Sequence, residues 1–191
     1  LGNSFQLHVP YEEKSDRWEP KPETWLYLED GLATMGVKPG VNVAAYKACC
    51  ETIDQHMRTL SEAVKSGELS IDEARKRAKQ VVQEQNPWQY VNLLEVRQGD
   101  VVDPSAGGIH HSWEEDTNRF PLGNVVFEIQ LDAMDPVATI RSFDQGKMKD
   151  DGSVRPMNIE DYFHYLKSDA ESNDISKLHT RPDGRELITT P

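Results

Sequence analysis

Two stretches in the first thirty residues of the chain have the pattern of β-strands, and a polar loop separates them. In the stretch SFQLHVP, apolar residues alternate with Gln6 and His8, which therefore share one face. Successive side chains of a strand point to opposite sides of a sheet, so this pattern predicts a β-strand. The stretch ETWLYLED, residues 23–30, predicts a second strand that ends at an Asp-Gly turn.

From Val41 the period changes to that of a helix. One amphipathic helix is predicted to stop near Gly67, and Ser70 with Glu73 forms a capping box that begins another. A third segment, PWQYVNLLEV, is predicted to close a helical insert over residues 41–97. The apolar positions of the first helix are Ile53, Met57, Leu60 and Val64.

Strand signals return after Gly99, in the stretches GDVVDPSAGGIHHSW, NVVFEIQLD and ATIRSFD. The stretch NIEDYFHYL predicts a short helix with Asn158 as its N-cap. The order of elements favours a mainly β fold, a small barrel or sandwich that carries a helical insert on one side. We expect a β domain over 1–40 and 98–157, and a helix with a polar extension that ends in ELITTP over 158–191.

Composition excludes some classes of partner. The net charge of −12 over 191 residues argues against nucleic acid and against an anionic membrane surface, and no apolar run is long enough to cross a bilayer. The adjacent Cys49 and Cys50 are poorly placed for a disulfide, which favours a reducing, cytoplasmic compartment. The first residue is Leu1, so the sequence is also compatible with a targeting segment that has been removed.

Several side chains are candidate metal ligands. Gln6 and His8 share a strand face, Glu23 opens the next strand, and His110 and His111 stand side by side later in the chain. Two imidazoles and a carboxylate suit a divalent ion such as Zn²⁺, and an amide oxygen adds a fourth ligand. Each residue alone is more often structural than ligating, so the prediction depends on their arrangement.

The arrangement around the paired histidines resembles the second motif of the cupin superfamily. Gly99, Gly107 and His110 fall on its spacing, although Ser105 stands where that motif usually has a proline. The resemblance implies that His110 is the metal ligand and that His111 faces away or contacts the site indirectly.

A more specific resemblance follows from several ordered blocks between Gln6 and Leu166. FQLHVP followed by KPETWLYLE is similar to the paired blocks of the type I phosphomannose isomerases, which are cupins. VNLLEVRQGDVV, NVVFEIQLDAMDPVATIRSFD and DGSVRPMNIED also resemble segments of that family. The resemblance implies a cupin-like β-barrel or jelly roll in which Gln6, His8, Glu23 and His110 bind one zinc ion.

The family interconverts mannose 6-phosphate and fructose 6-phosphate through an enediol. By resemblance, Arg141 and Lys21 are catalytic, and Arg141, Lys21 and Glu128 bind the sugar phosphate. Without the resemblance, Arg141 would be a strand cation paired with Asp144, and Lys21 an ordinary loop lysine. We expect Trp25, Tyr27 and Phe127 to belong to the core and not to stack on a sugar.

The chain also departs from the family. HVPYEE stands where the family has His-Pro-Asp, and the loop before ATIR is a few residues longer. The chain resembles an incomplete or shortened member, which favours a homo-oligomer or a complementary chain that completes the β domain. Two other readings remain open: a non-catalytic cupin that binds sugar or metal for regulation, and a metal-free interaction domain whose helical insert docks a partner.

Overall fold

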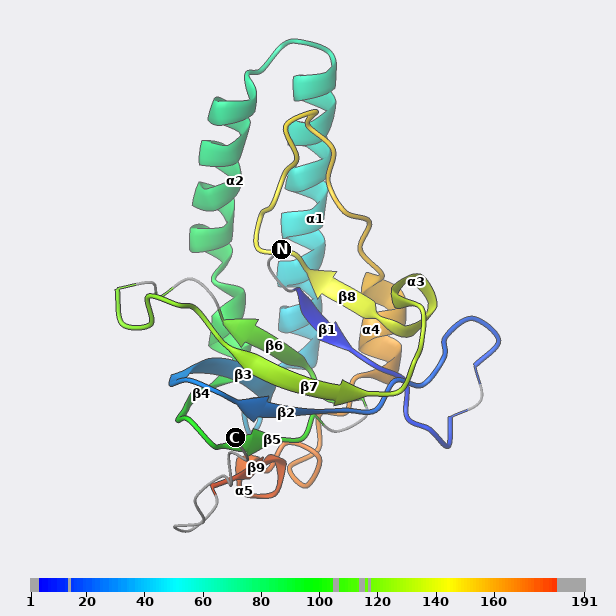
Figure 1. Ribbon diagram of the computed structural model, residues 1–191. Helices are drawn as coiled ribbons and strands as arrows, with labels where there is room; N and C mark the ends of the chain where they lie inside the picture. The colour runs from blue at the N-terminus through cyan, green and yellow to red at the C-terminus, as the bar shows by residue number, and fades with distance from the viewer. Residues whose placement is uncertain (1–3, 14, 105–106, 114–115, 117, 182–191) are drawn as a thin grey trace.

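The computed structural model describes residues 4–13, 15–104, 107–113, 116 and 118–181. Ser105 of the cupin motif and the terminal ELITTP lie outside the described residues. Figure 1 shows two sheets stacked on one another and a helical hairpin that extends beyond them. The strands are β1 (Phe5–Leu7), β2 (Glu23–Tyr27), β3 (Gly31–Val37), β4 (Val91–Val96), β5 (Val101–Val102), β6 (His110–Trp113), β7 (Val126–Gln130), β8 (Ile140–Phe143) and β9 (His179–Thr180). The helices are α1 (Val43–Lys65), α2 (Ile71–Gln85), a 3₁₀ turn (Pro87–Tyr90), α3 (Asp135–Ala138), α4 (Ile159–Tyr165) and α5 (Ile175–Leu178).

Both sheets are antiparallel. The first has the order β4-β3-β6-β1-β8 and the second the order β7-β2-β5-β9. The helices α1 and α4 cover the outer face of the first sheet, and the second sheet covers its inner face. The prediction of a mainly β fold with a helical segment is therefore confirmed.

The predicted alternation in β1 separates two cores. Phe5 and Leu7 are fully buried in the core between the first sheet and the helices. Gln6 and His8 point the other way, toward the space between the two sheets, where Trp25 and Tyr27 also lie buried. Period-two alternation thus places the polar candidates inside the sandwich.

The helical hairpin begins and turns at capped ends. The side chain of Asn42 accepts a hydrogen bond from the Ala45 N–H at the start of α1, and Ser70 accepts one from the Glu73 N–H at the start of α2. The predicted cap at Ser70 is therefore confirmed. Cys49 and Cys50 are buried and free on α1. No helix among the described residues is long and apolar enough to span a membrane.

The prediction that residues 87–96 close the helical insert is wrong for all but the first four of them. After the 3₁₀ turn, residues 91–96 form β4, which pairs with β3 along the edge of the first sheet. The strand β3 was not predicted at all. All seven of its residues are buried, so it shows no apolar–polar alternation, and it contains two glycines.

One further expectation fails, and another is confirmed in position but not in its side-chain bond. Phe127 is 55% exposed, because its side chain leaves the outer face of β7, where Ile129 is also exposed at 63%. Asn158 occupies the predicted N-cap position of α4, and its carbonyl oxygen accepts a hydrogen bond from the Tyr162 N–H at 2.8 Å. Its side chain makes no capping bond; the Oδ1 instead accepts a hydrogen bond from the Arg141 N–H on β8.

One buried amide fastens the segment after α4 to the first sheet. Asn173 accepts a hydrogen bond from the Val37 N–H at 2.7 Å and donates to the carbonyl oxygens of Lys167 and Asp169 at 3.1 and 2.7 Å. The side chain therefore satisfies the buried N–H of Val37 and two carbonyl groups of the more exposed segment after α4.

We expect Asn173→Ala to lower the free energy of unfolding by about 1–3 kcal/mol, because it leaves the buried N–H of Val37 without its partner. Urea denaturation measures the change. The exposed neighbour Ser168 provides the control, since Ser168→Ala should change stability by less than about 0.5 kcal/mol. Equal effects of the two substitutions would contradict the fastening role.

Candidate metal and substrate site

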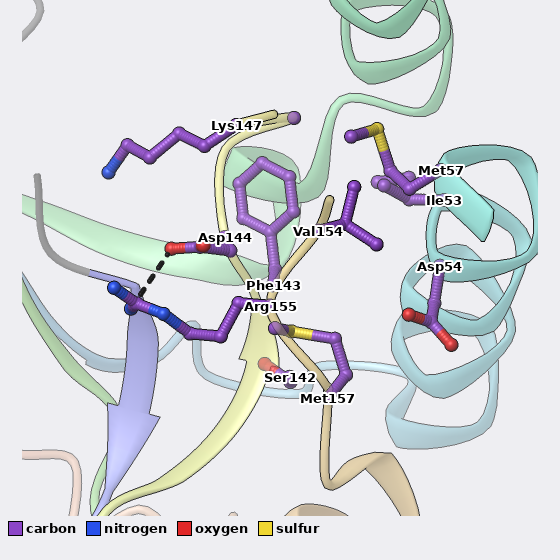
Figure 2. A pocket seen from close by; sticks show the side chains of 11 residues that line it. Ile53, Asp54, Met57, Ser142, Phe143, Asp144, Lys147, Val154, Arg155 and Met157 are labelled. Carbon is purple, nitrogen blue, oxygen red and sulfur yellow. Dashed lines mark hydrogen bonds and ion pairs between the residues drawn. The ribbon is translucent and has the colours of Figure 1, made fainter. Parts of the chain in front are cut away.

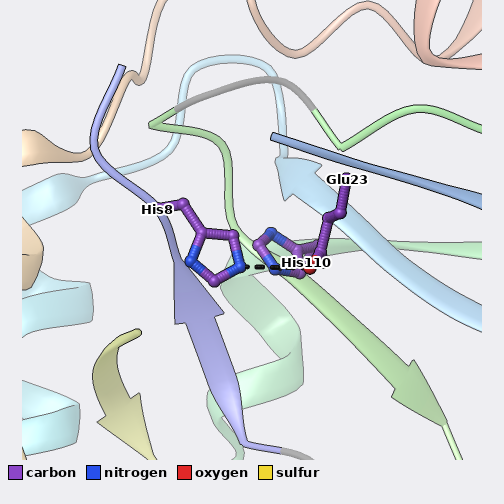
Figure 3. Close-up of side chains that lie close together, drawn as sticks. All are labelled: His8, Glu23 and His110. Atoms are coloured by element: carbon purple, nitrogen blue, oxygen red, sulfur yellow. Dashed lines mark ion pairs between the residues drawn. The ribbon is translucent and has the colours of Figure 1, made fainter. Parts of the chain in front are cut away.

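Three ligand-type side chains converge between the two sheets. His8 follows β1, Glu23 begins β2 and His110 begins β6, so three different strands supply them (Figure 3). His8 Nε2 lies 3.3 Å from Glu23 Oε2, and His110 Nε2 lies 3.0 Å from Glu23 Oε1. The ligand-type atoms of all three residues lie within 4.8 Å of one another, and all three residues are buried. The arrangement fits a single divalent cation bound by two imidazoles and a carboxylate.

Backbone carbonyls orient both imidazoles. His8 Nδ1 lies 2.6 Å from the Ala138 carbonyl oxygen, and His110 Nδ1 lies 3.1 Å from that of Gly108. A carbonyl oxygen only accepts, so each Nδ1 carries the proton and each Nε2 presents its lone pair to the site. Metal-binding histidines are commonly oriented in this way.

The neighbours of Glu23 favour its ionised form. Burial alone would raise the pKa of the Glu23 carboxyl, but the neighbouring His110 and His8 outweigh burial and hold that pKa far below its ordinary range. Burial lowers the pKa of His8, so its imidazole is neutral at neutral pH. An ionised carboxylate beside the neutral imidazole of His8 is a protonation state that suits metal binding.

Two buried atoms in the cluster lack hydrogen-bond partners in the described part of the chain. They are His8 Nε2 and Glu23 Oε1, and both face the other ligand-type atoms. Buried polar atoms rarely go without a partner, because each then loses its interaction with water. A bound cation would satisfy both atoms, so these residues fit a metal.

Gln6 also lies at the site. Its Nε2 is 3.3 Å from His110 Nε2, and its Oε1 accepts a hydrogen bond from the Ser4 hydroxyl at 3.3 Å. In this orientation the amide nitrogen faces the cluster. A half-turn of the amide group would place Oε1 there instead, and the Ser4 oxygen would then accept from the NH₂ group.

His111 lies on the opposite face of β6. It is fully buried in the core on the helix side, where its ring centroid is 5.5 Å from that of Phe5 and its Nε2 is 2.6 Å from Gln145 Nε2. Burial, with a smaller contribution from Lys147 and His110, lowers the pKa of His111 to about 3. Of the two adjacent histidines, only His110 faces the cluster.

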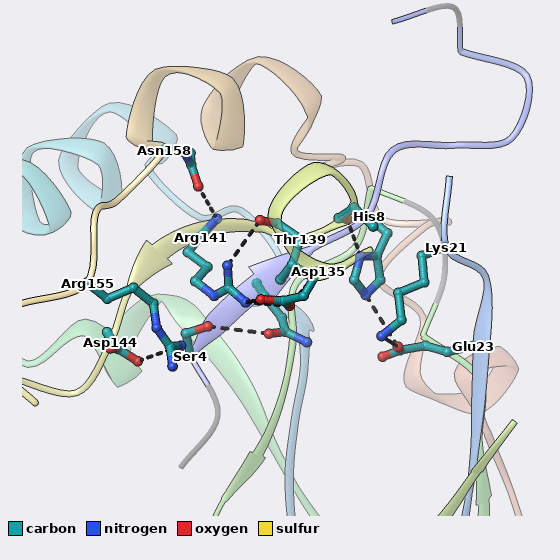
Figure 4. Close-up of polar contacts among 12 residues, drawn as sticks. Ser4, His8, Lys21, Glu23, Asp135, Thr139, Arg141, Asp144, Arg155 and Asn158 are labelled. Carbon is teal, nitrogen blue, oxygen red and sulfur yellow. Dashed lines mark hydrogen bonds and ion pairs between the residues drawn. The ribbon is translucent and has the colours of Figure 1, made fainter. Parts of the chain in front are cut away.

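Two of the predicted substrate-binding side chains, Lys21 and Arg141, are drawn with His8 and Glu23 in Figure 4. Lys21 Nζ donates to Glu23 Oε2 at 2.9 Å and to Glu128 Oε1 at 3.4 Å, so Lys21 and Glu128 meet at Glu23. These carboxylates raise the pKa of Lys21 although burial opposes them, while burial and the nearby Glu23 raise the pKa of Glu128. Lys21 is therefore held as a cation beside the metal candidates.

Arg141 lies directly opposite Gln6 in the pairing of β1 with β8, so both side chains leave the same face of the sheet. Its guanidinium pairs with Asp135, at 2.6 Å. The alternative pairing with Asp144 is not observed, because Asp144 pairs with Arg155 at 3.3 Å. Sequence patterns gave no signal for Asp135, since its role depends on how the loop before β8 folds back.

A separate pocket lies between α1 and the segment after β8 (Figure 2). Its floor is apolar, with Met57, Phe143 and Val154, and the pair of Asp144 and Arg155 lies on its border. None of the predicted metal or substrate residues lines it. His56, His164 and His179 are also absent from the metal cluster; His179 instead contacts Asp100 at 2.8 Å.

Comparison with known proteins identifies the fold. No protein-family model matches the chain, and no curated protein matches it. Mannose 6-phosphate isomerase from Bacillus subtilis is similar in structure, at 16% identity and a TM-score of 0.50 over 86% of this chain and 40% of that one. A mutant of phosphomannose isomerase from Salmonella typhimurium matches 97% of this chain and 55% of its own, at 13% identity and a TM-score of 0.49. A zinc-bound mannose 6-phosphate isomerase matches 88% of this chain and 52% of its own, at 13% identity and a TM-score of 0.46.

The fold is cupin-like. The chain spans about half the length of the isomerases that it resembles, or less. At these identities the likeness extends to the fold and not to activity.

We expect purified protein to bind about one zinc ion per chain, and His110→Ala to lose it because one of the converging Nε2 atoms is gone. Metal analysis after dialysis measures the content. The matched variant His111→Ala removes the neighbouring imidazole from the opposite face and should keep the zinc. Loss of zinc in both folded variants, or in neither, would contradict the assignment.

Stability should fall in acid because His111 is buried in its neutral form. Its pKa is about 3 in the folded chain, against 6.5 for an ordinary histidine. Between these values the unfolded chain binds a proton that the folded chain does not, so stability is full above pH 6.5 and declines toward pH 3. Urea unfolding at several pH values should show a shallower decline for His111→Gln than for wild type. The exposed His56 is the control, and His56→Gln should follow the wild-type curve.

Proposed function

We propose that the chain is the metal-bearing portion of a sugar-phosphate isomerase that interconverts mannose 6-phosphate and fructose 6-phosphate. The observation that carries the proposal is the convergence of His8, Glu23 and His110, with Lys21 in contact with Glu23. The cupin-like fold and the ordered blocks of the sequence support the same reading. The free thiols of Cys49 and Cys50 support a reducing compartment such as the cytoplasm.

The donor set supports zinc as the metal. Two imidazole nitrogens, one carboxylate and the amide oxygen of Gln6 after its half-turn would give four protein ligands. When bound, zinc would supply positive charge that polarises substrate oxygens. In the proposed site His8, Glu23, His110 and Gln6 would hold the metal in place.

The remaining side chains would bind and orient the sugar phosphate. Lys21 is a cation beside the metal ligands, with 13% of its side chain exposed, and would stabilise negative charge on an enediolate oxygen. Arg141, which is always charged, would bind an anionic oxygen of the substrate through its planar donors. Glu128 is the second carboxylate in contact with Lys21 and would fix the position of its ammonium group.

A coupled assay of mannose 6-phosphate isomerisation by the zinc-loaded chain tests the proposal. We expect Lys21→Met to lower kcat by about a hundredfold or more while zinc content is retained, because the cation next to the reacting oxygens is lost. Lys149→Met, which removes an exposed lysine far along the chain, is the matched control and should leave kcat unchanged.

Zinc binding without turnover in wild type would contradict the isomerase proposal for this chain and favour a cupin that binds sugar or metal for regulation. Activity that appears only with a second polypeptide would instead support the predicted complementary chain. Absence of zinc from the wild-type protein would favour the reading of the chain as a metal-free interaction domain whose helical insert docks a partner.

A further inference from the structure

The guanidinium of Arg141, which we propose binds the substrate, is already paired with the carboxylate of Asp135. Arg141 Nη2 donates to both oxygens of Asp135, at 2.6 and 2.8 Å, and Arg141 Nη1 makes a longer contact of 3.4 Å with the Thr139 carbonyl oxygen (Figure 4). Asp135 belongs to α3, in the loop that connects β7 to β8. The contact is therefore made by a residue only six positions away in the sequence.

The pair does not use the full donor capacity of the guanidinium. Both oxygens of Asp135 bind the same nitrogen, and Arg141 Nε has no hydrogen-bond partner among the residues that the structure describes. An anion that bonds two nitrogens in parallel makes a stronger contact than one that bonds a single nitrogen. The guanidinium of Arg141 therefore retains a donor that Asp135 does not use.

The two members of the pair differ in exposure. The Arg141 side chain is 11% exposed, whereas that of Asp135 is 68% exposed. The carboxylate thus covers the guanidinium from the solvent side and has water to move into. Asp135 is well solvated once it moves away, so it loses little on leaving the pair, and an incoming anion would take its place beside the largely buried Arg141.

The backbone of α3 is held more firmly than its acidic side chain. The Ala138 carbonyl accepts a hydrogen bond from His8 at 2.6 Å, and both Ala138 and Thr139 are buried. The Thr139 hydroxyl donates to Asp135 Oδ1 at 2.9 Å, which steadies the carboxylate near Arg141. A rotation of the Asp135 side chain can therefore uncover Arg141 without moving His8.

We propose that Asp135 is a displaceable counter-anion that makes Arg141 selective for a phosphate group. The inference rests on the proposed function, because it takes Arg141 as the group that binds an anionic oxygen of the substrate. A phosphate monoester carries a charge of about −1.5 to −2 and three oxygens, so it competes successfully with a singly charged carboxylate. A neutral sugar hydroxyl does not, and Asp135 thereby excludes unphosphorylated sugars from this position.

The test is the affinity of the zinc-loaded chain for inorganic phosphate, measured by calorimetry. In Asp135→Asn the competing charge is gone, and we expect phosphate to bind about fivefold tighter or more than in wild type. The control Asp132→Asn makes the same charge change at an exposed position of the same loop and should leave the affinity as in wild type. The double variant Asp135→Asn/Arg141→Met should lose the gain.

Steady-state kinetics give a second readout. With mannose 6-phosphate, Asp135→Asn should lower KM with little change in kcat, whereas a merely structural role would lower stability and kcat together. Zinc content and thermal melting are measured for every variant, with Asp135→Ser as a second way to remove the carboxylate.

An unchanged phosphate affinity in folded, zinc-loaded Asp135→Asn would overturn the proposal, as would an equal gain in Asp132→Asn. Failure of both Asp135 variants to fold would also overturn it, because a displaceable group is not required for folding. A gain in phosphate affinity without isomerase activity would support the role of Asp135 as a counter-anion and contradict only the proposed isomerase activity.

Discussion

A carboxylate buried between two sheets needs positive charge close to it, and Glu23 is such a carboxylate. Its side chain is 1% exposed, and an ionised group at that depth would be unstable without compensation. Lys21 supplies that charge, with its Nζ 2.9 Å from Glu23 Oε2, and the imidazoles of His8 and His110 lie 3.3 and 3.0 Å from the two carboxylate oxygens. Because Glu23 stays ionised, its carboxylate lies next to the Nε2 lone pairs of His8 and His110. A cation between these three groups would interact favourably with all of them.

The register in which β1 pairs with its two neighbouring strands brings these side chains together. Gln6 stands opposite His110 on one side and opposite Arg141 on the other, so β1 brings the amide, an imidazole and the arginine to one face of the first sheet. Glu23 belongs to the second sheet and faces them across the inner space. A slip of one residue in β1 would turn Gln6 and His8 into the helix-side core and bring Phe5 and Leu7 to the site.

Much of this arrangement could be read from the sequence, for identifiable reasons. Alternation in SFQLHVP fixed the face of Gln6 and His8, and alternation in GIHHSW allowed only one of the paired histidines to join them. The strand β3 escaped prediction because burial on both faces removes alternation. Asp135 and the carbonyls of Ala138 and Gly108 escaped because loop geometry and backbone atoms leave no pattern of residue types. Phe127 was misplaced because an apolar residue on an edge strand has the same local pattern as one in a core.

The sequence distances of these contacts have a consequence for the order of folding. The α1–α2 hairpin closes between neighbours in sequence, whereas the bond from His8 to Ala138 joins residues 130 positions apart and the contact from Gln6 to His110 spans 104. Loop closure on that scale is entropically costly and belongs to the late part of folding. The hairpin can therefore form while the cluster does not yet exist. A metal that needs His8, Glu23 and His110 together would bind only after the sheets have closed, and would slow unfolding more than it speeds folding.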